Sequence, residues 1–263
     1  MARADVELVA RGLAPSRSAA QRLIADGAVR REDGRPVTRP AESVGSADVL
    51  QVQDSDETRF VSRAGAKLAH ALDQVDFAPE GCTILDLGMS TGGFADCLLQ
   101  RGAARVVGVE VGHGQLHPRL RGDPRVICLE RTHARELTPA LLRQQVPDAP
   151  AGGFDRMVAD LSFISLTKVL PAVAALLAPE ARLLLLVKPQ FELGPTALDG
   201  RGVVTDPEAR VRAVALVAET CSALGWTVQF TLESALPGGD GNIEFFLSVH
   251  LPCAQAQGAR SPS

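Results

Sequence analysis

The clearest chemical feature of the sequence is a strand-to-helix turn that carries an acidic residue. Residues 84–94 read Ile-Leu-Asp-Leu-Gly-Met-Ser-Thr-Gly-Gly-Phe, so an apolar strand with Asp86 near its end runs into a glycine-rich turn and then a helix. In an open α/β sheet such a turn lies where ligands bind, and its glycines let a ligand lie against bare backbone. A carboxylate at this place would repel phosphates. It suits the cationic sulfonium and the amino group of S-adenosylmethionine.

The next predicted strand also ends on an acidic residue. Glu110 follows Asp86 by 24 residues and closes the run Arg-Val-Val-Gly-Val-Glu, where it can accept hydrogen bonds from ribose hydroxyls. The glycine spacing differs from the Gly-x-Gly-x-x-Gly of a pyrophosphate site. Alone, the glycines could be ordinary turn residues, but the two acidic strand ends favour a nucleoside cofactor. The expected S-adenosylmethionine site comprises Asp86, Gly88, Ser90, Thr91, Gly92, Gly93, Phe94, Glu110 and Asp160.

Four charged residues are predicted to meet at the same rim. Asp160 and Lys188 close two later apolar strands, and Glu244 begins the last strand. Lys67 lies on a helix that precedes the first strand. Singly, each could be an ordinary solvated residue, although an apolar strand followed by Pro189 is an unusual place for an idle lysine. The set suits methyl transfer to a hydroxyl, because a lysine among other charges in a closed site can take the hydroxyl proton or hold the oxyanion.

We assign that role to Lys188, acting on a ribose 2′-hydroxyl. Asp160 and Glu244 are expected to orient the lysines, and Lys67 is expected to help position the ribose. Displacement at a methyl group is in line, so most of the rate must come from the positioning of oxygen, carbon and sulfur.

A parallel sheet is needed to bring these residues together, and the pattern from residue 83 predicts one. Strands are expected at 83–87, 104–110, 126–129, 155–159, 182–187, 226–232 and 243–250, with helices at 92–101, around 115–120, 138–144, 165–177 and 207–224. Five strands alternating with helices indicate a mostly parallel sheet, and the last two can form an antiparallel hairpin. The predicted fold class is α/β, a seven-stranded Rossmann-like methyltransferase sheet with a small N-terminal α+β domain.

Residues 1–40 differ in charge from the rest of the chain. They hold eight arginines and five acidic residues, a net charge of +3, whereas the whole chain has a formal charge of −4. Two short helices are predicted: 6–11, stopped by Gly12, and 16–26, capped by Ser16 and stopped by Gly27. Short extended segments are expected at 28–31, 36–38 and 48–52. Arginine binds phosphate oxygens in a fork, so this segment could contact RNA, or it could be a solvated charged face.

Composition limits the remaining possibilities. At 263 residues the chain can form one large and one small domain, and 46% hydrophobic residues is ordinary for a packed protein. No apolar run reaches the length of a membrane span, and the first residues lack a signal-peptide core. The five cysteines are scattered without metal or disulfide spacing. We expect a cytoplasmic protein, a monomer, without a metal site or membrane contact.

Two stretches resemble known families. Residues 16–29, Ser-Arg-Ser-Ala-Ala-Gln-Arg-Leu-Ile-Ala-Asp-Gly-Ala-Val, resemble the S4 RNA-binding module. Motifs beginning at Ser62, Asp86, Gly108, Glu130, Asp160, Val187 and Gly241 resemble the TlyA family, also called hemolysin A, which pairs an S4 module with an FtsJ-like rRNA methyltransferase domain. The similarity covers residues 3–250.

The resemblance implies a function and a set of residues. The function is S-adenosylmethionine-dependent 2′-O-methylation of cytidine in ribosomal RNA, 16S, 23S or both. The family's Lys-Asp-Lys-Glu tetrad carries over onto Lys67, Asp160, Lys188 and Glu244. The RNA-contacting arginines implied are Arg3, Arg17, Arg22, Arg30 and Arg63. The domains expected are an S4-like domain at 1–57, a linker at 58–61, the methyltransferase domain at 62–253 and a disordered tail at 254–263.

Several positions depart from the family pattern. Ala64 replaces glycine, Met89 replaces alanine and is expected to crowd the cofactor turn, and His113 replaces an aromatic residue. Glu110 replaces aspartate, which keeps the ribose acceptor but extends it by about one bond. His117-Pro118 replaces Asp-Trp, which puts the local helix in doubt.

Two rival functions come from other classes. A pore-forming haemolysin would need an export signal, an amphipathic insertion helix or barrel-forming strands, and the sequence shows none. A non-catalytic ribosome-binding or assembly factor would be expected to have a broken tetrad or a lost acid in the cofactor turn, and both motifs are whole.

Overall fold

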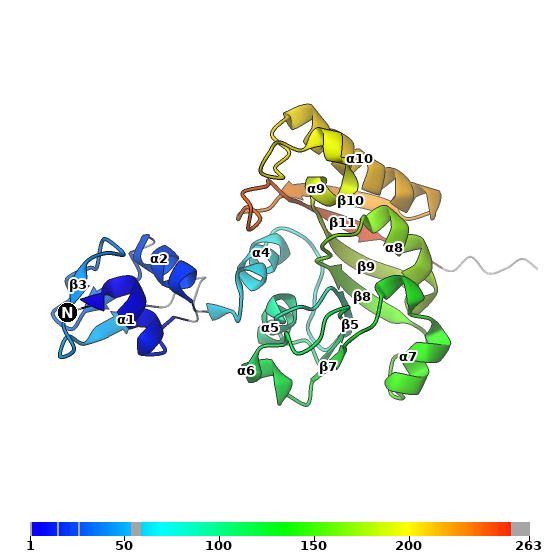
Figure 1. Cartoon of the computed structure of the whole chain (residues 1–263). Coiled ribbons are helices and arrows are strands. Elements are labelled where there is room, and N and C mark those ends of the chain that lie inside the picture. Colours follow the sequence, from blue (N-terminus) through cyan, green and yellow to red (C-terminus); the bar gives the residue numbers. More distant parts are fainter. Residues whose placement is uncertain (1, 15, 26, 54–58, 254–263) are drawn as a thin grey trace, which may run out of the picture. The chain divides into compact units, whose positions relative to one another are not determined.

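The computed structural model describes residues 2–14, 16–25, 27–53 and 59–253. By their contacts, the residues form two compact units, Met1–Ala66 and Lys67–Ser263, and each is described by itself (Figure 1). The predicted tail from residue 254 and most of the acidic stretch 53–58 lie outside the described residues. The predicted domain limits at 57 and 62 stay a prediction.

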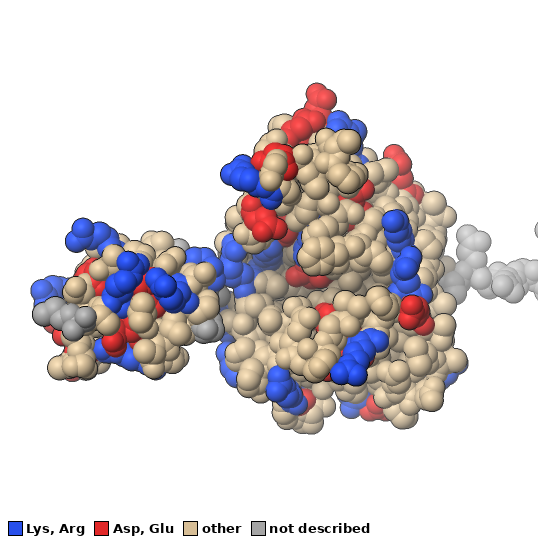
Figure 2. Space-filling view, viewed as in Figure 1, with Lys and Arg blue, Asp and Glu red and all other residues tan. Residues whose placement is uncertain are grey.

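Between residues 2 and 53, the described part of the N-terminal unit contains two helices and two short antiparallel strand pairs. Its elements are β1 (Ala2–Arg3), α1 (Ala4–Ala10), α2 (Arg17–Ala25), β2 (Val29–Arg31), β3 (Ser43–Val44) and β4 (Leu50–Val52). β1 pairs with β3, and β2 pairs with β4. Its core includes Leu8, Leu23 and Ile24 of the helices, packed with Val29 and Val37. Figure 2 shows basic side chains interspersed with acidic ones on the visible face of this unit.

Local signals at the helix ends act as predicted. The Ser16 hydroxyl accepts a hydrogen bond from the Ala19 N–H at 3.2 Å, and Gly12 and Gly27 both have a φ of +70°, which favours glycine. The sequence does not predict β1 and β3, because two-residue strands carry no alternating pattern. The predicted extended segment 36–38 contributes only a single bridge, between Arg30 and Pro36.

The larger unit contains a seven-stranded sheet with the order β10-β11-β9-β8-β5-β6-β7. The strands are β5 (Thr83–Leu87), β6 (Arg105–Val109), β7 (Val126–Leu129), β8 (Phe154–Ala159), β9 (Leu177–Val187), β10 (Thr227–Glu233) and β11 (Phe245–His250). β5 to β9 pair in parallel, whereas β11 runs antiparallel to both β9 and β10. The predicted fold class, including the antiparallel final pair, is confirmed.

Helices cover both faces of this sheet. They are α4 (Arg63–Leu72), α5 (Gly93–Gln100), α6 (Pro118–Arg121), η1 (Ala134–Glu136), α7 (Pro139–Gln145), α8 (Leu166–Val173), η2 (Ala174–Leu176), α9 (Pro189–Glu192), η3 (Pro195–Ala197) and α10 (Pro207–Ala223). α4 and α5 lie on one side, and α7 and α8 lie on the other (Figure 1). The predicted helix 165–177 is present as α8 followed directly by the 3-10 turn η2, together residues 166–176. The strand β9 begins at Leu177, five residues before the predicted start at 182.

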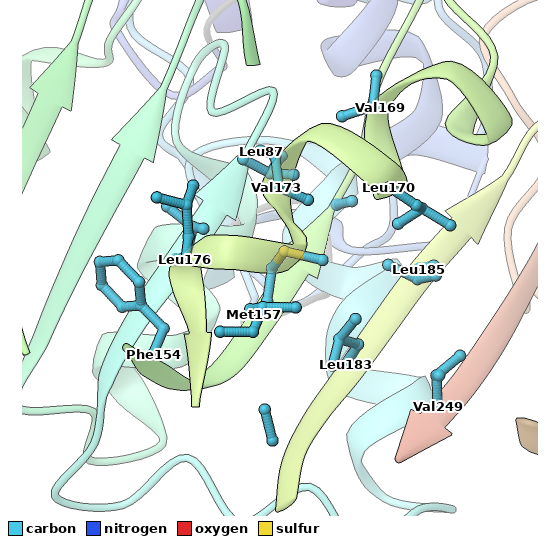
Figure 3. Close-up of a cluster of buried hydrophobic side chains, with 14 of the residues drawn as sticks. Leu87, Phe154, Met157, Val169, Leu170, Val173, Leu176, Leu183, Leu185 and Val249 are labelled. Carbon is cyan, nitrogen blue, oxygen red and sulfur yellow. The ribbon is translucent and has the colours of Figure 1, made fainter. Parts of the chain in front are cut away.

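Except for the largely exposed edge strand β10, the strands are mostly apolar on both faces, as a sheet covered on both sides requires. Leu87 and Leu183 belong to one continuous buried cluster with the α8 residues Val169 and Val173 (Figure 3). On the opposite face, the ring of Phe94 in α5 stacks on Phe246 of β11, with centroids 6.1 Å apart. Packing on both faces fixes where the strand ends lie.

Strand register brings the predicted site residues to one edge. Leu87 pairs with Val109 on one side and with Ala159 on the other, so Gly88, Glu110 and Asp160 are the next residues at three adjacent strand ends. Val187 of β9 lies opposite Phe245 of β11. Continuing that antiparallel register places Lys188 opposite Glu244.

Leu185→Ala tests the contribution of the core. Leu185 is fully buried in the cluster that joins the sheet to α8 (Figure 3), so its truncation should cost about 2–5 kcal/mol in the free energy of unfolding of the larger unit. Urea denaturation followed by circular dichroism measures this value. Val211→Ala, at a side chain that is 68% exposed on α10, serves as the control and should change it by less than about 0.5 kcal/mol. Equal effects of the two variants would contradict the core described here.

Candidate functional site

The turn after β5 is built on two glycines that no other residue could replace without displacement. Gly88 has a φ of +86°, and a β-carbon there would lie 2.4 Å from the carbonyl oxygen of Asp160. Gly92 has a φ of +89°, and a β-carbon there would lie 2.4 Å from Leu120 Cδ1. The first glycine thus packs the turn directly against the end of β8. The second admits the side chain of α6 beneath the start of α5.

Asp86 is a buried carboxylate without a counter-charge. Its side chain is fully buried, and no described residue donates a hydrogen bond to either oxygen. Burial raises the pKa of Asp86 well above its usual value, and the neighbouring charges of Asp160 and Glu110 raise it further. A buried polar group that lacks a partner is costly unless a ligand satisfies it.

Glu110 is held in place by backbone groups. Its Oε2 accepts the Ser90 N–H at 2.9 Å, and its Oε1 accepts the Gly112 N–H at 2.7 Å. Each carboxylate oxygen has a second lone pair, so the side chain keeps acceptor capacity for ribose hydroxyls. Ser90 itself has a positive φ of +47°, which is uncommon outside glycine. Such a conformation persists only where the surrounding structure holds it in place.

A cavity of about 910 Å³ lies beside these groups. Its lining residues are Gly88, Ser90, Glu110, Val111, Gln115, His133, Ala134, Arg135, Asp160, Leu161, Ser162, Phe163, Ile164, Ser165, Lys168, Val169, Gln190 and Phe191. The volume lies in the range of pockets that hold drug-sized ligands. A cationic nucleoside such as S-adenosylmethionine fits this combination of a glycine-rich turn, acidic strand ends and a buried carboxylate without a hydrogen-bond donor.

Not every residue predicted for the cofactor lines this cavity. Gly88, Ser90, Glu110 and Asp160 do. The other five, Asp86, Thr91, Gly92, Gly93 and Phe94, do not. Phe94 is buried against Phe246, so its side chain contributes to the packing of the core.

Two departures from the family pattern are accommodated locally. Met89 does not crowd the turn as expected. Its side chain is buried away from the cavity over Gly108, where a β-carbon would lie 2.1 Å from Met89 Cε. His117 caps α6, because its Nδ1 accepts the Arg119 N–H at 3.2 Å. The helix that this substitution put in doubt is therefore present.

The tetrad residues form two ion pairs. Lys188 Nζ lies 2.6 Å from Asp160 Oδ1 and donates to the Ser162 hydroxyl at 3.0 Å. Lys67 Nζ donates to Glu244 Oε2 at 2.5 Å, and both side chains are more than 90% buried. The Lys188 and Asp160 side chains are 12% and 17% exposed, so this pair is the more accessible one.

The loop before Glu244 is fixed by its own contacts. Asn242 is fully buried, accepts the Val204 N–H at 2.9 Å and donates to the Gly202 carbonyl at 3.1 Å. Gly238 lies so close to Glu244 that a β-carbon there would be 2.6 Å from its Oε1. Glu244 is therefore held on Lys67 by the strand and by the loop together.

Sequence reasoning missed several residues near Lys188. Phe163 is 91% exposed with a φ of +63°, and its ring lies 5.2 Å from that of Phe191. Gln190 has a buried side-chain oxygen with no hydrogen-bond donor among the described residues. Glu192 accepts hydrogen bonds from the Ser165 hydroxyl at 2.5 Å and the Leu166 N–H at 3.0 Å, and burial raises its pKa. All lie in the motifs that begin at Asp160 and Val187, but none of them begins or ends a predicted strand, so strand ends alone do not identify them.

The predicted RNA-contacting arginines come from four elements, with Arg17 and Arg22 both on α2, and all are exposed or partly exposed. Arg3 ends β1 and Arg17 begins α2, with side chains 48% and 59% exposed. Arg30 in β2 donates to Gln53 and to the Gly34 carbonyl. Arg22 lies in the last turn of α2, and Arg63 begins α4.

Among the described residues, no helix has both the length and the apolar character needed to cross a membrane.

Comparison with known proteins agrees with these features. Residues 60–251 match the FtsJ-like methyltransferase family, and residues 3–50 match the S4 domain. The chain is 47% identical over 259 residues to the 16S/23S rRNA (cytidine-2′-O)-methyltransferase TlyA of Mycobacterium tuberculosis, covering 98% of this chain and 93% of that protein. A solved Streptococcus thermophilus structure that carries the hemolysin designation is 34% identical, with a TM-score of 0.71 over 95% of this chain and 88% of the other.

A more distant solved structure supports the fold alone. An S-adenosylmethionine-dependent methyltransferase from Mesorhizobium loti aligns with a TM-score of 0.51 at 15% identity, covering 71% of this chain and 97% of the other.

Asp86→Asn tests whether the buried carboxylate opposes folding in the free protein. A raised pKa means that Asp86 favours the folded state below its unfolded pKa and that this contribution is lost as the pH rises through the folded pKa. The variant should therefore be more stable than the wild type, by on the order of 1–3 kcal/mol at pH 8.5 and by less at pH 5.5. Denaturation at both pH values measures this difference.

Asp123→Asn is the matched control. Hydrogen bonds from Arg125 lower the pKa of Asp123, so its stabilising contribution is present at pH 8.5 and its replacement should give no gain in stability. A loss of stability in Asp86→Asn at pH 8.5 would mean that the carboxylate has a partner in the free protein.

Proposed function

The chain belongs to the FtsJ-like methyltransferase family and carries an S4 domain before it. From this premise, and from its similarity to TlyA over nearly its whole length, we propose that it methylates the 2′-hydroxyl of cytidine in ribosomal RNA, 16S, 23S or both. The observation that carries the proposal is the Lys188–Asp160 ion pair, which stands at the edge of a cavity suited to a cationic nucleoside. S-adenosylmethionine is the proposed methyl donor.

The cavity offers separate groups to the parts of the cofactor. Glu110 would accept hydrogen bonds from the ribose hydroxyls, as an acid at the end of the second strand does in related nucleotide sites. Asp160 lines the cavity and would face the positive charge, whereas Asp86 is buried behind the turn and would act on that charge through space. The cluster of carboxylates becomes favourable once the cofactor is bound. When bound, S-adenosylmethionine supplies an electrophilic methyl group on a sulfonium.

The tetrad would prepare the hydroxyl that accepts this methyl group. A ribose hydroxyl is a weak nucleophile and loses its proton as the new C–O bond forms. Lys188 Nζ, held by Asp160 and Ser162, would take that proton or stabilise the negative charge on the oxygen. Lys67 is bound to Glu244, which the β9–β11 register places opposite Lys188, and would position the ribose. Positioning then contributes much of the rate.

Two further features support an RNA substrate. The exposed ring of Phe163 lies beside the Lys188 segment, and an exposed aromatic face suits stacking against an unpaired base. The N-terminal unit, with its arginines at the surface, would bind RNA backbone. A protein that modifies ribosomal RNA would work in the cytoplasm, and we expect it to act as a monomer without membrane contact.

Lys188→Ala tests the proposed chemistry. Transfer of methyl groups from radiolabelled S-adenosylmethionine to ribosomal subunits should fall by at least about 100-fold, because the group that handles the hydroxyl proton is gone. Cofactor affinity, measured by isothermal titration calorimetry, should change less than about threefold. Lys188→Arg should be nearly as inactive, since a guanidinium keeps the charge but does not release or accept a proton near neutral pH.

Arg212→Ala controls for the loss of one positive charge. Its side chain is 59% exposed on α10, does not line the cavity and should leave transfer unchanged. An equal loss of cofactor affinity and transfer in Lys188→Ala would assign the lysine a structural role and contradict the mechanism.

A further inference from the structure

Asp5 is a buried carboxylate in the first turn of α1. Within the described part of the N-terminal unit, it is the one charged side chain that is fully buried. Buried acids are uncommon unless they are paired, and the tetrad and the cofactor cavity belong to the other unit. Asp5 therefore needs an explanation of its own.

The carboxylate receives four hydrogen bonds from three side chains. Arg3 donates through Nε at 2.9 Å and through Nη2 at 3.1 Å, so its guanidinium binds as a fork. Arg17 donates through Nη2 at 3.0 Å, and Gln21, one turn further along α2, donates at 3.0 Å. The hydrogen bonds from Arg3, followed by those from Gln21 and Arg17, hold the pKa of Asp5 far below its usual range against the effect of burial.

The two arginines come from different elements but share this one anion. Arg3 ends β1 and Arg17 begins α2, so the strand and the helix each fix one of them. Two guanidinium groups repel each other, and the carboxylate between them makes their close approach favourable. Both side chains stay about half exposed, and a guanidinium has five N–H donors, so each arginine keeps donors for a ligand in solvent.

We propose that Asp5 is a positioning residue that presents Arg3 and Arg17 side by side to the phosphate backbone of RNA. The inference rests on the proposed function, since it assumes that the N-terminal unit binds ribosomal RNA. Arginine forks bind phosphate oxygens in pairs, and a preset pair loses less conformational entropy on binding than two free side chains. Asp5 does not contact the RNA in this account. It acts only through the two arginines.

Asp5→Asn should change the affinity for RNA in the direction opposite to the one expected from charge alone. Removing a negative charge next to arginines should strengthen binding to a polyanion if charge alone matters. In Asp5→Asn one carboxylate oxygen becomes an NH2 group, which cannot accept a hydrogen bond. In place of Oδ1 it would face Arg3 Nε, and in place of Oδ2 it would face Arg3 Nη2, Arg17 and Gln21, so in either orientation the arginine pair should separate. Removing this negative charge should therefore weaken RNA binding.

The test measures binding of full-length protein to purified 30S and 50S ribosomal subunits over a series of salt concentrations. Asp5→Asn should raise the dissociation constant about tenfold at low salt. It should also flatten the plot of log affinity against log salt by about 1.4–1.8, because each of two lost phosphate contacts contributes about 0.7–0.9 to that slope. An unchanged or higher affinity would overturn the proposal.

Asp33→Asn is the matched control. Asp33 lies in the same unit, loses the same charge and is paired with one exposed arginine, Arg35, at 2.7 Å. It should leave affinity unchanged or raise it. A loss equal to that of Asp5→Asn would overturn the proposal, because the effect would then follow charge and not position.

A double-mutant cycle separates positioning from loss of folding. In an Arg3→Ala, Arg17→Ala background, adding Asp5→Asn should leave both affinity and salt slope unchanged, since nothing remains to be positioned. A further loss of affinity there would show that Asp5 only maintains the fold. If the wild type bound neither subunit, the proposed function would fail, whereas binding by the wild type and equal binding by Asp5→Asn would overturn only this inference.

Discussion

The site depends on negative charge gathered at the carboxyl edge of a buried parallel sheet. Asp160 is balanced by Lys188, and Glu110 accepts two backbone N–H groups, but Asp86 has no donor among the described residues. The free protein therefore has a buried carboxyl group without a hydrogen-bond donor or counter-charge, and this lowers its free energy of unfolding. A cationic ligand would remove this cost. The same arrangement that weakens the free fold thus favours a sulfonium cofactor over an anionic nucleotide, in keeping with the frequent opposition between stability and function.

The choice of cation in this chain follows its chemistry. Lysine and arginine total 27 residues, and only three of them are lysine: Lys67, Lys168 and Lys188. Two belong to the tetrad, and the third, Lys168, lines the cavity next to Asp160. Elsewhere, including the N-terminal unit, positive charge is supplied by arginine, which suits forked contacts to carboxylates and phosphates. Arginine cannot exchange a proton near neutral pH, so the proposed role of residue 188 requires a lysine.

Much of the fold and part of the site could be predicted from the sequence. Strands such as Thr83–Leu87 are short apolar runs with clear ends, and parallel pairing then brings Asp86, Glu110 and Asp160 to one edge. The pairing of Lys67 with Glu244 could not be read, because it joins residues 177 positions apart through the register of β11. The burial of Met89 over Gly108 depends on a cross-strand contact, and the exposure of Phe163 depends on a single positive φ. Neither leaves a periodic signal.

The most direct test of the account is to locate the methyl group that the protein transfers. Separated 30S and 50S subunits from a strain that lacks the protein would be incubated with it and with radiolabelled S-adenosylmethionine, and the product mapped by primer extension sensitive to 2′-O-methylation. The account predicts incorporation at the ribose of a cytidine in at least one subunit. Incorporation on a base, or cofactor binding without incorporation into either subunit, would contradict it.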